Sequence, residues 1–354
     1  MNKYTERINK LRKLMAEQGL EAFYICQRNN VSYYTGKKGD DCSLYITQDE
    51  AWIITDFRYE EMAQSLTWLQ FYETSAGHGL MDFLKSRKEK ALGIERNGLS
   101  LDMYFRFWEE LSQELKPVMG LTEKLRQIKD PDELAAIAKA ESIGDAAFTH
   151  ILKYLKPGIT EKEVATEIEY AMRQNGADGL SFTTIAVSGT NSSSPHGVPT
   201  DKKLENGDFL TMDYGCIYDL YCSDMTRTVA IGHATEEMVK VYDIVLKAQL
   251  NACEKIHAGL TGKECDALAR DVIAAAGYGD RFGHSLGHSL GLFIHESPNY
   301  SMRCEDVIEE NMVLSIEPGI YLPGKFGVRI EDIAIVKKDG IENLTHSPKE
   351  LIII

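Results

Sequence analysis

An internal repeat constrains the fold of this 354-residue chain more than any other feature of its sequence. The segment 155–177, LKPGITEKEVATEIEYAMRQNGA, aligns with 256–278, IHAGLTGKECDALARDVIAAAGY, at an offset of 101 residues. A second pair, LENGDFLTMDYG at 204–215 and IEENMVLSIEPG at 308–319, aligns at an offset of 104. Two matches in the same order predict a duplicated α+β unit with pseudo-twofold symmetry. The alternative is a coincidence between similar helices.

The repeat lies in the second of two predicted domains. Residues 1–123 read as a smaller mixed α/β domain, with a helix ending near Gly19, strands SLYIT and AWIITD, and helices in GLMDFLKSRKEK and LDMYFRFWEELSQEL. Pro131 in LRQIKDPDEL is followed by acidic residues, which predicts the start of a long helix. We therefore place the domain boundary between residues 123 and 124, with a second domain of residues 124–354.

Four carboxylates stand out in the repeated strands. Asp213 and Glu317 end matching apolar strands, and Asp224 in CSDMTRT and Glu331 in VRIEDIAIV follow them. Any one of these acids alone is best read as a surface carboxylate, but four in repeat-related strands favour a metal site. Their summed charge of −4 matches two divalent ions. Hard oxygen donors with one imidazole favour manganese, with cobalt, iron and zinc as alternatives.

The spacing of these acids predicts how they meet. If each segment folds as a hairpin about its midpoint, at Tyr218–Asp219 and at Gly324, the acids of each pair face one another across antiparallel strands. Like charges in that position destabilise a sheet unless a cation lies between them. Alternation along VRIEDIAIV places Arg329 on the same face as Glu331, where it can orient a ligating carboxylate.

The stretch GHSLGHSLGLFIHE, residues 283–296, resembles a helical zinc grip because His284 and His288 are four residues apart. Glycine recurs every fourth residue in the same stretch, and each would cost a helix about 1 kcal/mol relative to alanine. A turn and strand are therefore predicted, and each histidine has to be judged alone. His196 in SPHGVP lies at roughly the repeat position of His295 in FIHESP, which predicts a pair flanking a central site.

Composition excludes several classes of protein. The net charge of −15 disfavours nucleic acid and anionic membranes as partners, and no apolar run approaches the ~18 residues of a membrane span. The first residues, MNKYTERINKLRKLM, lack the apolar core of a secretory signal. The seven cysteines contain no CxxC pair, which favours reduced thiols and a cytoplasmic location.

Six ordered motifs resemble those of the pita-bread metallopeptidases, in the Xaa-Pro branch that contains aminopeptidase P and prolidase. They are SPHG, TMDYG, SDMTRT, GHSLGHSLGLFIHE, SIEPGIY and VRIEDI. The resemblance covers the whole chain, because NVSYYTG and TDFRY resemble a creatinase-type N-terminal domain and LRQIKDPDEL the start of the catalytic domain. It implies an α+β pita-bread catalytic domain at 124–354 preceded by a creatinase-like domain at 1–123.

The same resemblance implies a dinuclear metal centre, with Asp224 and Glu331 bridging the two ions. The full ligand set that it implies is Asp213, Asp224, His288, Glu317 and Glu331. The other site residues are His196, His284, His295, Arg329 and Tyr321. The resemblance assigns the three histidines to substrate contacts. His295 would lie at the developing oxyanion, and His196 and His284 at the proline pocket. Glu317 would also carry the proton from water to the leaving nitrogen.

The function that these residues predict is hydrolysis of Xaa-Pro bonds at the N-terminus of peptides, as in aminopeptidase P. The alternative is a prolidase that accepts only dipeptides. More remote alternatives are a non-catalytic binding module on the same fold and a hydrolase of a different amide. The expected substrate is a proline-containing peptide. The family resemblance also implies a homodimer, in which the partner is a second copy of the chain.

Overall fold

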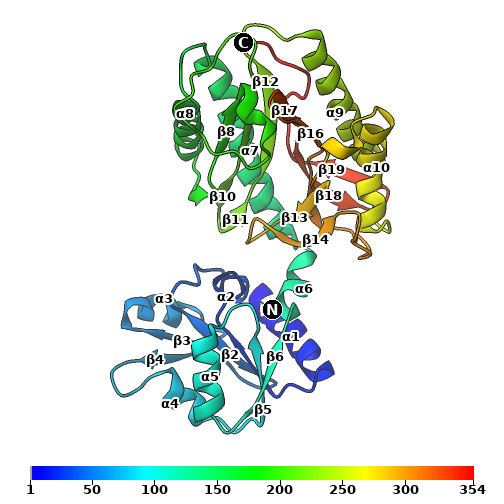
Figure 1. Cartoon of the computed structure of the whole chain (residues 1–354). Coiled ribbons are helices and arrows are strands. Elements are labelled where there is room, and N and C mark those ends of the chain that lie inside the picture. The colour runs from blue at the N-terminus through cyan, green and yellow to red at the C-terminus, as the bar shows by residue number, and fades with distance from the viewer. Residues whose placement is uncertain (1) are drawn as a thin grey trace. The chain divides into compact units, whose positions relative to one another are not determined.

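The structure, a computed structural model, describes residues 2–354. It contains two compact units, one ending at Arg126 and the other running from Gln127 to Ile354 (Figure 1). The boundary predicted between residues 123 and 124 falls inside helix α6, Leu121–Gln127, and stays a prediction. Among residues 2–354, none of the helices combines the length and apolar character of a membrane span.

The first unit is built on a six-stranded mixed sheet in the order β4-β3-β2-β1-β5-β6. Its strands are β1 Ala22–Ile25, β2 Ser43–Thr47, β3 Ala51–Asp56, β4 Gln70–Thr74, β5 Ala91–Glu95 and β6 Glu114–Val118. Its helical elements before α6 are α1 Lys3–Glu17, α2 Arg28–Thr35, η1 Phe57–Tyr59, α3 Glu60–Ser65, α4 Leu80–Lys85 and α5 Leu101–Glu110. The predicted α1, β2 and β3 are thus confirmed.

The helix predicted from LDMYFRFWEELSQEL is wrong in its last residues. Helix α5 ends at Glu110, Leu111 takes an extended conformation, and β6 pairs with β5 in parallel. Pro117 disfavours a helical conformation for Lys116 alone, so it does not account for the end of the helix at Glu110. Residues from Glu114 onwards pair with β5 instead, and this long-range pairing overrides the local helical pattern.

The second unit contains two helix pairs and two sets of strands. The helices are α7 Pro131–Tyr154, α8 Glu161–Gln174, α9 Glu236–Lys255 and α10 Gly262–Ala275, with short turns η2 Gly189–Ser193 and η3 Gly279–Arg281. The first set of strands is β7 Gly179–Leu180, β8 Ile185–Ser188, β9 Phe209–Tyr214, β10 Cys216–Tyr218, β11 Tyr221–Cys222 and β12 Met225–Ala230. The second set is β13 Gly287–Ser289, β14 Glu296–Tyr300, β15 Val313–Ile316, β16 Gly319–Leu322, β17 Phe326–Arg329, β18 Asp332–Lys337 and β19 Gly340–Asn343.

The duplicated α+β unit is confirmed by its elements. Helices α8 and α10 begin 101 residues apart, and both open with a capping box in which a threonine N-cap, Thr160 or Thr261, bonds reciprocally with a glutamate three residues on. One apolar cluster packs α7 and α8 on β9 and β12, and a second packs α9 and α10 on β15 and β18. Helices α8 and α10 consequently lie at opposite edges of the unit, with strands between them (Figure 1).

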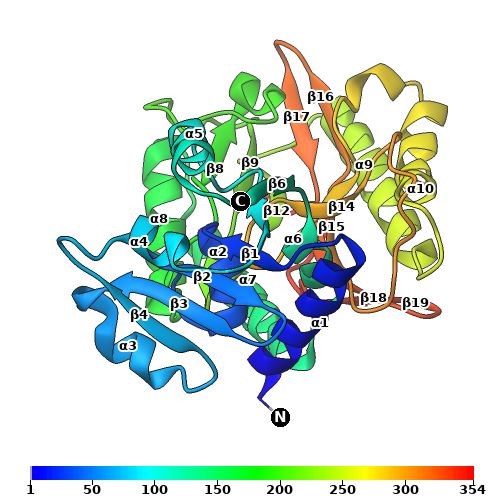
Figure 2. The ribbon, with the colours of Figure 1, turned by 90° about the horizontal axis from the view of Figure 1, so that it is seen from below.

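The predicted turn position is correct for one of the two hairpins and wrong for the other. The β16–β17 hairpin pairs Gly319 with Arg329 and turns at Gly324, whose φ is +76°, so its predicted midpoint is confirmed. It projects from the unit as a two-stranded ribbon (Figure 2). In the other hairpin β9 pairs with β12 so that Asp213 lies opposite Thr226.

The predicted facing of Asp213 and Asp224 is therefore wrong. The turn centres on Asp219 and Leu220, both with positive φ, one residue later than its predicted position. A turn displaced by one residue moves every cross-strand partner by two. Asp224 then lies just before β12 rather than within it.

Candidate metal centre

A cavity of about 520 Å³ in the second unit collects nearly all of the predicted site residues. Those that line it are Asp213, Asp224, Glu317, Glu331, His196, His284, His288, His295 and Arg329. Tyr321 is outside this lining, but its hydroxyl lies 2.9 Å from His284 Nε2. The structure therefore brings together residues that are up to 135 positions apart in the sequence, from His196 to Glu331.

Strand ends deliver the four acids to this cavity. Asp213 is the penultimate residue of β9, and Asp224 immediately precedes β12. Glu317 lies in the break between β15 and β16, and Glu331 in the break between β17 and β18. The antiparallel register of β15 with β18 and of β16 with β17 brings these two breaks opposite each other. Because residues at such breaks are not paired within a strand, their side chains can turn towards the cavity without disrupting the sheet.

Three of the predicted ligands already have the spacing of a metal site. Asp224, His288 and Glu331 each offer one ligand atom, and these atoms all lie within 4.8 Å of one another. His288 Nε2 is 3.5 Å from Asp224 Oδ2 and 3.6 Å from Glu317 Oε1. Asp213 is not in this group, and one of its oxygens accepts a hydrogen bond from Arg329.

Two carboxylate oxygens in the cavity fit a cation. Asp213 Oδ1 and Asp224 Oδ1 are buried and have no hydrogen-bond partner within the described chain. A buried acceptor without a donor costs about 1–3 kcal/mol. A divalent ion coordinated by carboxylates would remove that cost, and oxygen donors of this kind are what such hard ions prefer.

The pKa values of the acids also indicate a cation site. Burial raises the pKa of Asp224 and of Glu331 well above the usual carboxyl range, and the neighbouring carboxylates raise both further. Burial also raises the pKa of Glu317 to about 8, although the Arg329 charge opposes the shift. Carboxyl groups this close cannot all ionise unless additional positive charge lies among them.

His284 and His288 are neutral near pH 7, which is the form that binds a metal. Burial lowers the pKa of His284 to about 4, with Arg329 contributing. Burial lowers that of His288 to about 4 as well, with His295 contributing. The Nδ1 atom of His288 lies 3.1 Å from the Ser289 carbonyl oxygen. A proton on Nδ1 leaves the Nε2 lone pair directed at Asp224 and Glu317.

Arg329 connects the acids to Tyr321, and through the Tyr321 hydroxyl to His284. Its guanidinium donates to Asp213 Oδ2 at 2.6 Å, to the Tyr321 hydroxyl at 2.7 Å and to Thr226 Oγ1 at 3.0 Å. The Thr226 hydroxyl in turn donates to Glu331 Oε2 at 2.7 Å. Arg329 therefore orients Asp213 directly and Glu331 through Thr226, which refines the predicted adjacency of Arg329 and Glu331.

Three residues that contact the site acids were not identified from the sequence. Besides Thr226, fully buried Arg227 donates to the Glu331 carbonyl oxygen at 2.5 Å and to Asp332 Oδ1 at 2.8 Å. Glu141 accepts the backbone N–H of Asp224 at 3.3 Å, and burial raises its pKa to about 8. Thr226 and Arg227 lie in the SDMTRT motif, so proximity to Asp224 was a usable signal. Nothing in the sequence around Glu141 marks it.

The histidine-rich stretch is not helical, which confirms the prediction of a turn and strand. Its centre is β13, bends flank that strand, and its last residue, Glu296, begins β14. A Cβ atom at Gly287 would lie 1.9 Å from the Ser315 carbonyl oxygen, so glycine is required where β13 passes this neighbour. Gly287 therefore allows the close backbone packing that carries His288 to the acids.

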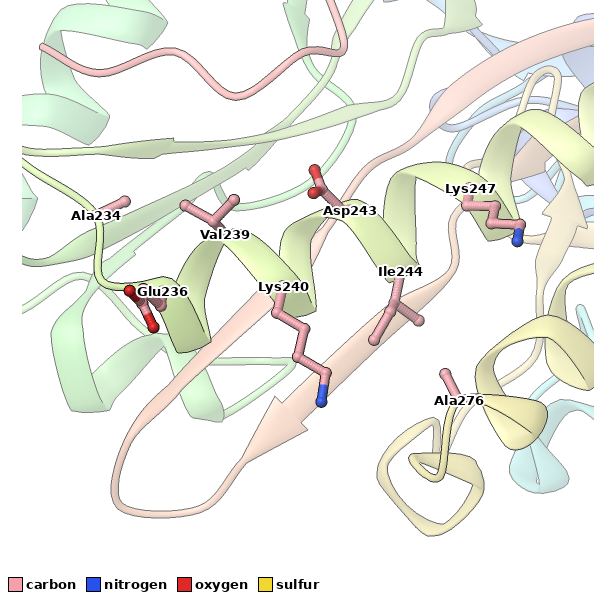
Figure 3. A pocket seen from close by; sticks show the side chains of 8 residues that line it. All are labelled: Ala234, Glu236, Val239, Lys240, Asp243, Ile244, Lys247 and Ala276. Atoms are coloured by element: carbon pink, nitrogen blue, oxygen red, sulfur yellow. The ribbon is translucent and has the colours of Figure 1, made fainter.

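A second cavity, of about 740 Å³, lies over the outer face of α9 and contains none of the predicted site residues (Figure 3). It is lined by Ala234, Glu236, Val239, Lys240, Asp243, Ile244, Lys247 and Ala276. The side chains of Glu236, Lys240, Asp243 and Lys247 are exposed and of mixed charge. This is the ordinary character of a solvated helix face, so the chemistry belongs to the smaller cavity.

Comparisons with known proteins identify both units. Residues 135–338 match the model of metallopeptidase family M24, and residues 7–128 match that of the creatinase/prolidase N-terminal domain. A Xaa-Pro dipeptidase of Pyrococcus furiosus is 38% identical, over 98% of this chain and 99% of that protein.

Solved structures agree with this assignment. A Xaa-Pro dipeptidase from Bacillus anthracis superposes with a TM-score of 0.97 at 41% identity, covering 99% of this chain and 100% of that one. An X-Pro aminopeptidase from Thermotoga maritima gives 0.89 at 37% identity, covering 98% and 99%. The predicted pita-bread fold with a creatinase-type N-terminal domain is confirmed, and the chain belongs to metallopeptidase family M24.

Proposed function

We propose that this protein is a Xaa-Pro dipeptidase, a metallopeptidase that hydrolyses the bond before proline in dipeptides. The observation that carries the proposal is its near full-length similarity to the P. furiosus and B. anthracis Xaa-Pro dipeptidases. The sequence alone favoured aminopeptidase P, with the dipeptidase as its alternative. The relatives support that alternative better.

Membership of a metallopeptidase family implies divalent metal ions. The residues that would hold them are Asp213, Asp224, His288, Glu317 and Glu331. Four carboxylates match the charge of two divalent ions, and their hard oxygens favour manganese. When bound, such ions supply the Lewis acidity that amide hydrolysis near neutral pH requires.

The other side chains would bind substrate and move protons. Glu317 would take a proton from the attacking water and return it to the proline nitrogen. His295 would donate a hydrogen bond to the oxyanion. His196 and His284 would bound the proline side of the pocket, with Tyr321 fixing His284 through its hydroxyl.

Paired substrates test the proposal. The purified chain, supplied with manganese, should hydrolyse Ala-Pro and leave Ala-Pro-Ala intact, because a dipeptidase requires the carboxylate directly on the proline. Efficient cleavage of Ala-Pro-Ala would instead establish an aminopeptidase. Gly-Ala serves as the control for specificity, and its cleavage at an equal rate would contradict selection of proline.

The aminopeptidase remains a second candidate because the T. maritima structure, named an X-Pro aminopeptidase, also matches over nearly the full chain. Metal analysis addresses the more remote binding module. A protein that binds no divalent ion would support a scaffold, whereas about two ions per chain would support the proposed enzyme.

We infer a homodimer and a cytoplasmic location from the family resemblance and the sequence. All seven cysteines are free thiols in the structure, which supports a reducing compartment. Sedimentation equilibrium of the purified chain tests the dimer, and a monomer at micromolar concentration would contradict it.

A further inference from the structure

Glu161, the first residue of α8, is fully buried although it carries a carboxylate. Its Oε1 accepts the Ser188 backbone N–H at 2.6 Å, the Ser188 hydroxyl at 2.9 Å and the Asn191 side-chain amide at 3.1 Å. Its Oε2 accepts the Thr200 backbone N–H at 2.9 Å and the Thr200 hydroxyl at 2.7 Å. Hydrogen bonds to a carboxylate are about twice as strong as those between neutral groups.

These donors all lie on the loop 188–200, which carries His196 into the cavity. Glu161 binds the loop at both ends, at Ser188 and at Thr200. The loop is fixed from the opposite side as well, because Gly327 N–H donates to Ser192 Oγ at 2.9 Å. Arg329 also donates to the Pro195 carbonyl oxygen at 3.3 Å, directly before His196.

The second half of the repeat holds a histidine in a related way. Arg270 on α10 donates to the His284 carbonyl oxygen at 2.7 Å and forms an ion pair with Asp266 on the same helix. Asp266 accepts the Leu286 backbone N–H at 3.0 Å. In both halves a charged group on the helix after the capping threonine fixes the backbone of a segment that bears a site histidine.

We propose that Glu161 is a positioning residue: it closes the 188–200 loop so that His196 faces the substrate. The inference rests on the proposed substrate contact of His196. Glu161 itself lines no part of the cavity, so its effect on catalysis has to pass through the loop.

Glu161→Gln tests this role with little change in shape. All of the Glu161 partners above are donors, so an amide NH₂ in place of one oxygen would face a donor and lose hydrogen bonds there. We expect KM for Ala-Pro to rise about tenfold, which is the loss of one or two such bonds. The kcat should stay within about twofold and the bound metal should be unchanged, because the ligands lie on other elements.

Glu163→Gln is the matched control, since Glu163 lies on the same helix, is exposed, and caps Thr160 rather than the loop. It should leave KM unchanged. His196→Ala completes a double-mutant cycle: if Glu161 acts through His196, the KM effects of the two changes will not multiply. Effects that multiply, or loss of metal in Glu161→Gln, would overturn the proposal.

Thr200→Val provides a second route if Glu161→Gln does not fold. It removes the hydroxyl that donates to Glu161 and keeps the backbone donor, and we expect a smaller rise in KM of about threefold. An unchanged KM in Thr200→Val would contradict the positioning role. If His196→Ala leaves KM unchanged, His196 does not contact the substrate, and that part of the proposed function is wrong too. A raised KM in His196→Ala but not in Glu161→Gln would overturn the positioning role alone.

Discussion

At the scale of single residues, the cavity concentrates more negative charge than its own cations can balance. Arg329 forms an ion pair with Asp213, which leaves Asp224, Glu317 and Glu331 close together with raised pKa values. Opposed carboxylates of this kind weaken a fold unless they bind something. Metal binding is therefore expected to stabilise the protein as well as to activate it.

Asp224→Asn should remove most of the bound divalent metal, because it replaces a charged ligand with a neutral amide. We expect hydrolysis of Ala-Pro to fall more than about 100-fold, beyond the usual effect of losing a supporting contact. Mass spectrometry of metals in the dialysed protein provides the measurement. Asp219→Asn, at the exposed tip of the same hairpin, is the control and should retain metal and activity.

Tyr321→Phe should lower kcat/KM about tenfold, because the hydroxyl joins Arg329 to His284. Steady-state kinetics on Ala-Pro measures it. Tyr242→Phe removes a comparable hydrogen bond, from the Tyr242 hydroxyl to the Lys349 carbonyl oxygen, on α9. It should reduce stability and leave kcat/KM unchanged, and equal kinetic losses in both variants would contradict a role for Tyr321 in the site.

At the scale of elements, the accuracy of prediction depended on whether a turn was marked in the sequence. Gly324 marks the β16–β17 turn because glycine readily adopts positive φ. The other hairpin turns at Asp219 and Leu220, and no glycine in CIYDLYC indicates the position. The register of β9 with β12 therefore could not be predicted, although the repeat had identified β9.

The supporting residues were unpredictable for a related reason. Glu141 and Arg227 are helix and strand residues whose partners lie between about 80 and 204 positions away, such as Thr345 for Glu141. A local pattern carries no information about contacts of that length. The repeat and the motifs, in contrast, located Asp213, Glu317 and the histidines, because these residues recur at fixed places in repeated elements or in family motifs.

The two capping boxes should contribute equally to stability. Thr160→Ala and Thr261→Ala each remove an N-cap that accepts a backbone N–H, at a cost of about 1 kcal/mol in the free energy of unfolding. The costs should add, since α8 and α10 pack in different apolar clusters. Urea unfolding followed by circular dichroism measures them. Serine at either position keeps the hydroxyl and should have no effect, so a similar loss with serine would contradict the capping explanation.

At the scale of the whole molecule, the first unit has a titrating group of its own. Burial raises the pKa of Glu95 to about 7, even though Gln27, Asn30 and Cys26 donate hydrogen bonds that oppose the shift. Because the folded-state pKa lies above the usual carboxyl value, Glu95 binds its proton more tightly when folded. Its effect on stability is absent below the usual carboxyl pKa, becomes increasingly unfavourable as pH rises from there to about 7, and stays constant at higher pH.

The amide of Glu95→Gln loses hydrogen bonds from these donors at every pH, but the free energy of unfolding of the variant relative to the unchanged chain should be higher at pH 8 than at pH 4, by up to about 3 kcal/mol. Urea unfolding of the full chain at both pH values provides the measurement. Glu114→Gln, at an exposed position of the same sheet, is the control and should show no such pH dependence. A constant difference between Glu95→Gln and the unchanged chain at both pH values would contradict the assigned titration.

The division of the proposed metal ligands between the repeat halves has a practical consequence. Asp213 and Asp224 precede the connection between β12 and α9, whereas His288, Glu317 and Glu331 follow it. A chain cut between Gly232 and Thr235 would yield two fragments, neither of which holds a full set of donors. Reassociation of such fragments would be coupled to ion capture, so a reporter fused to each could serve as a genetically encoded sensor for divalent metals.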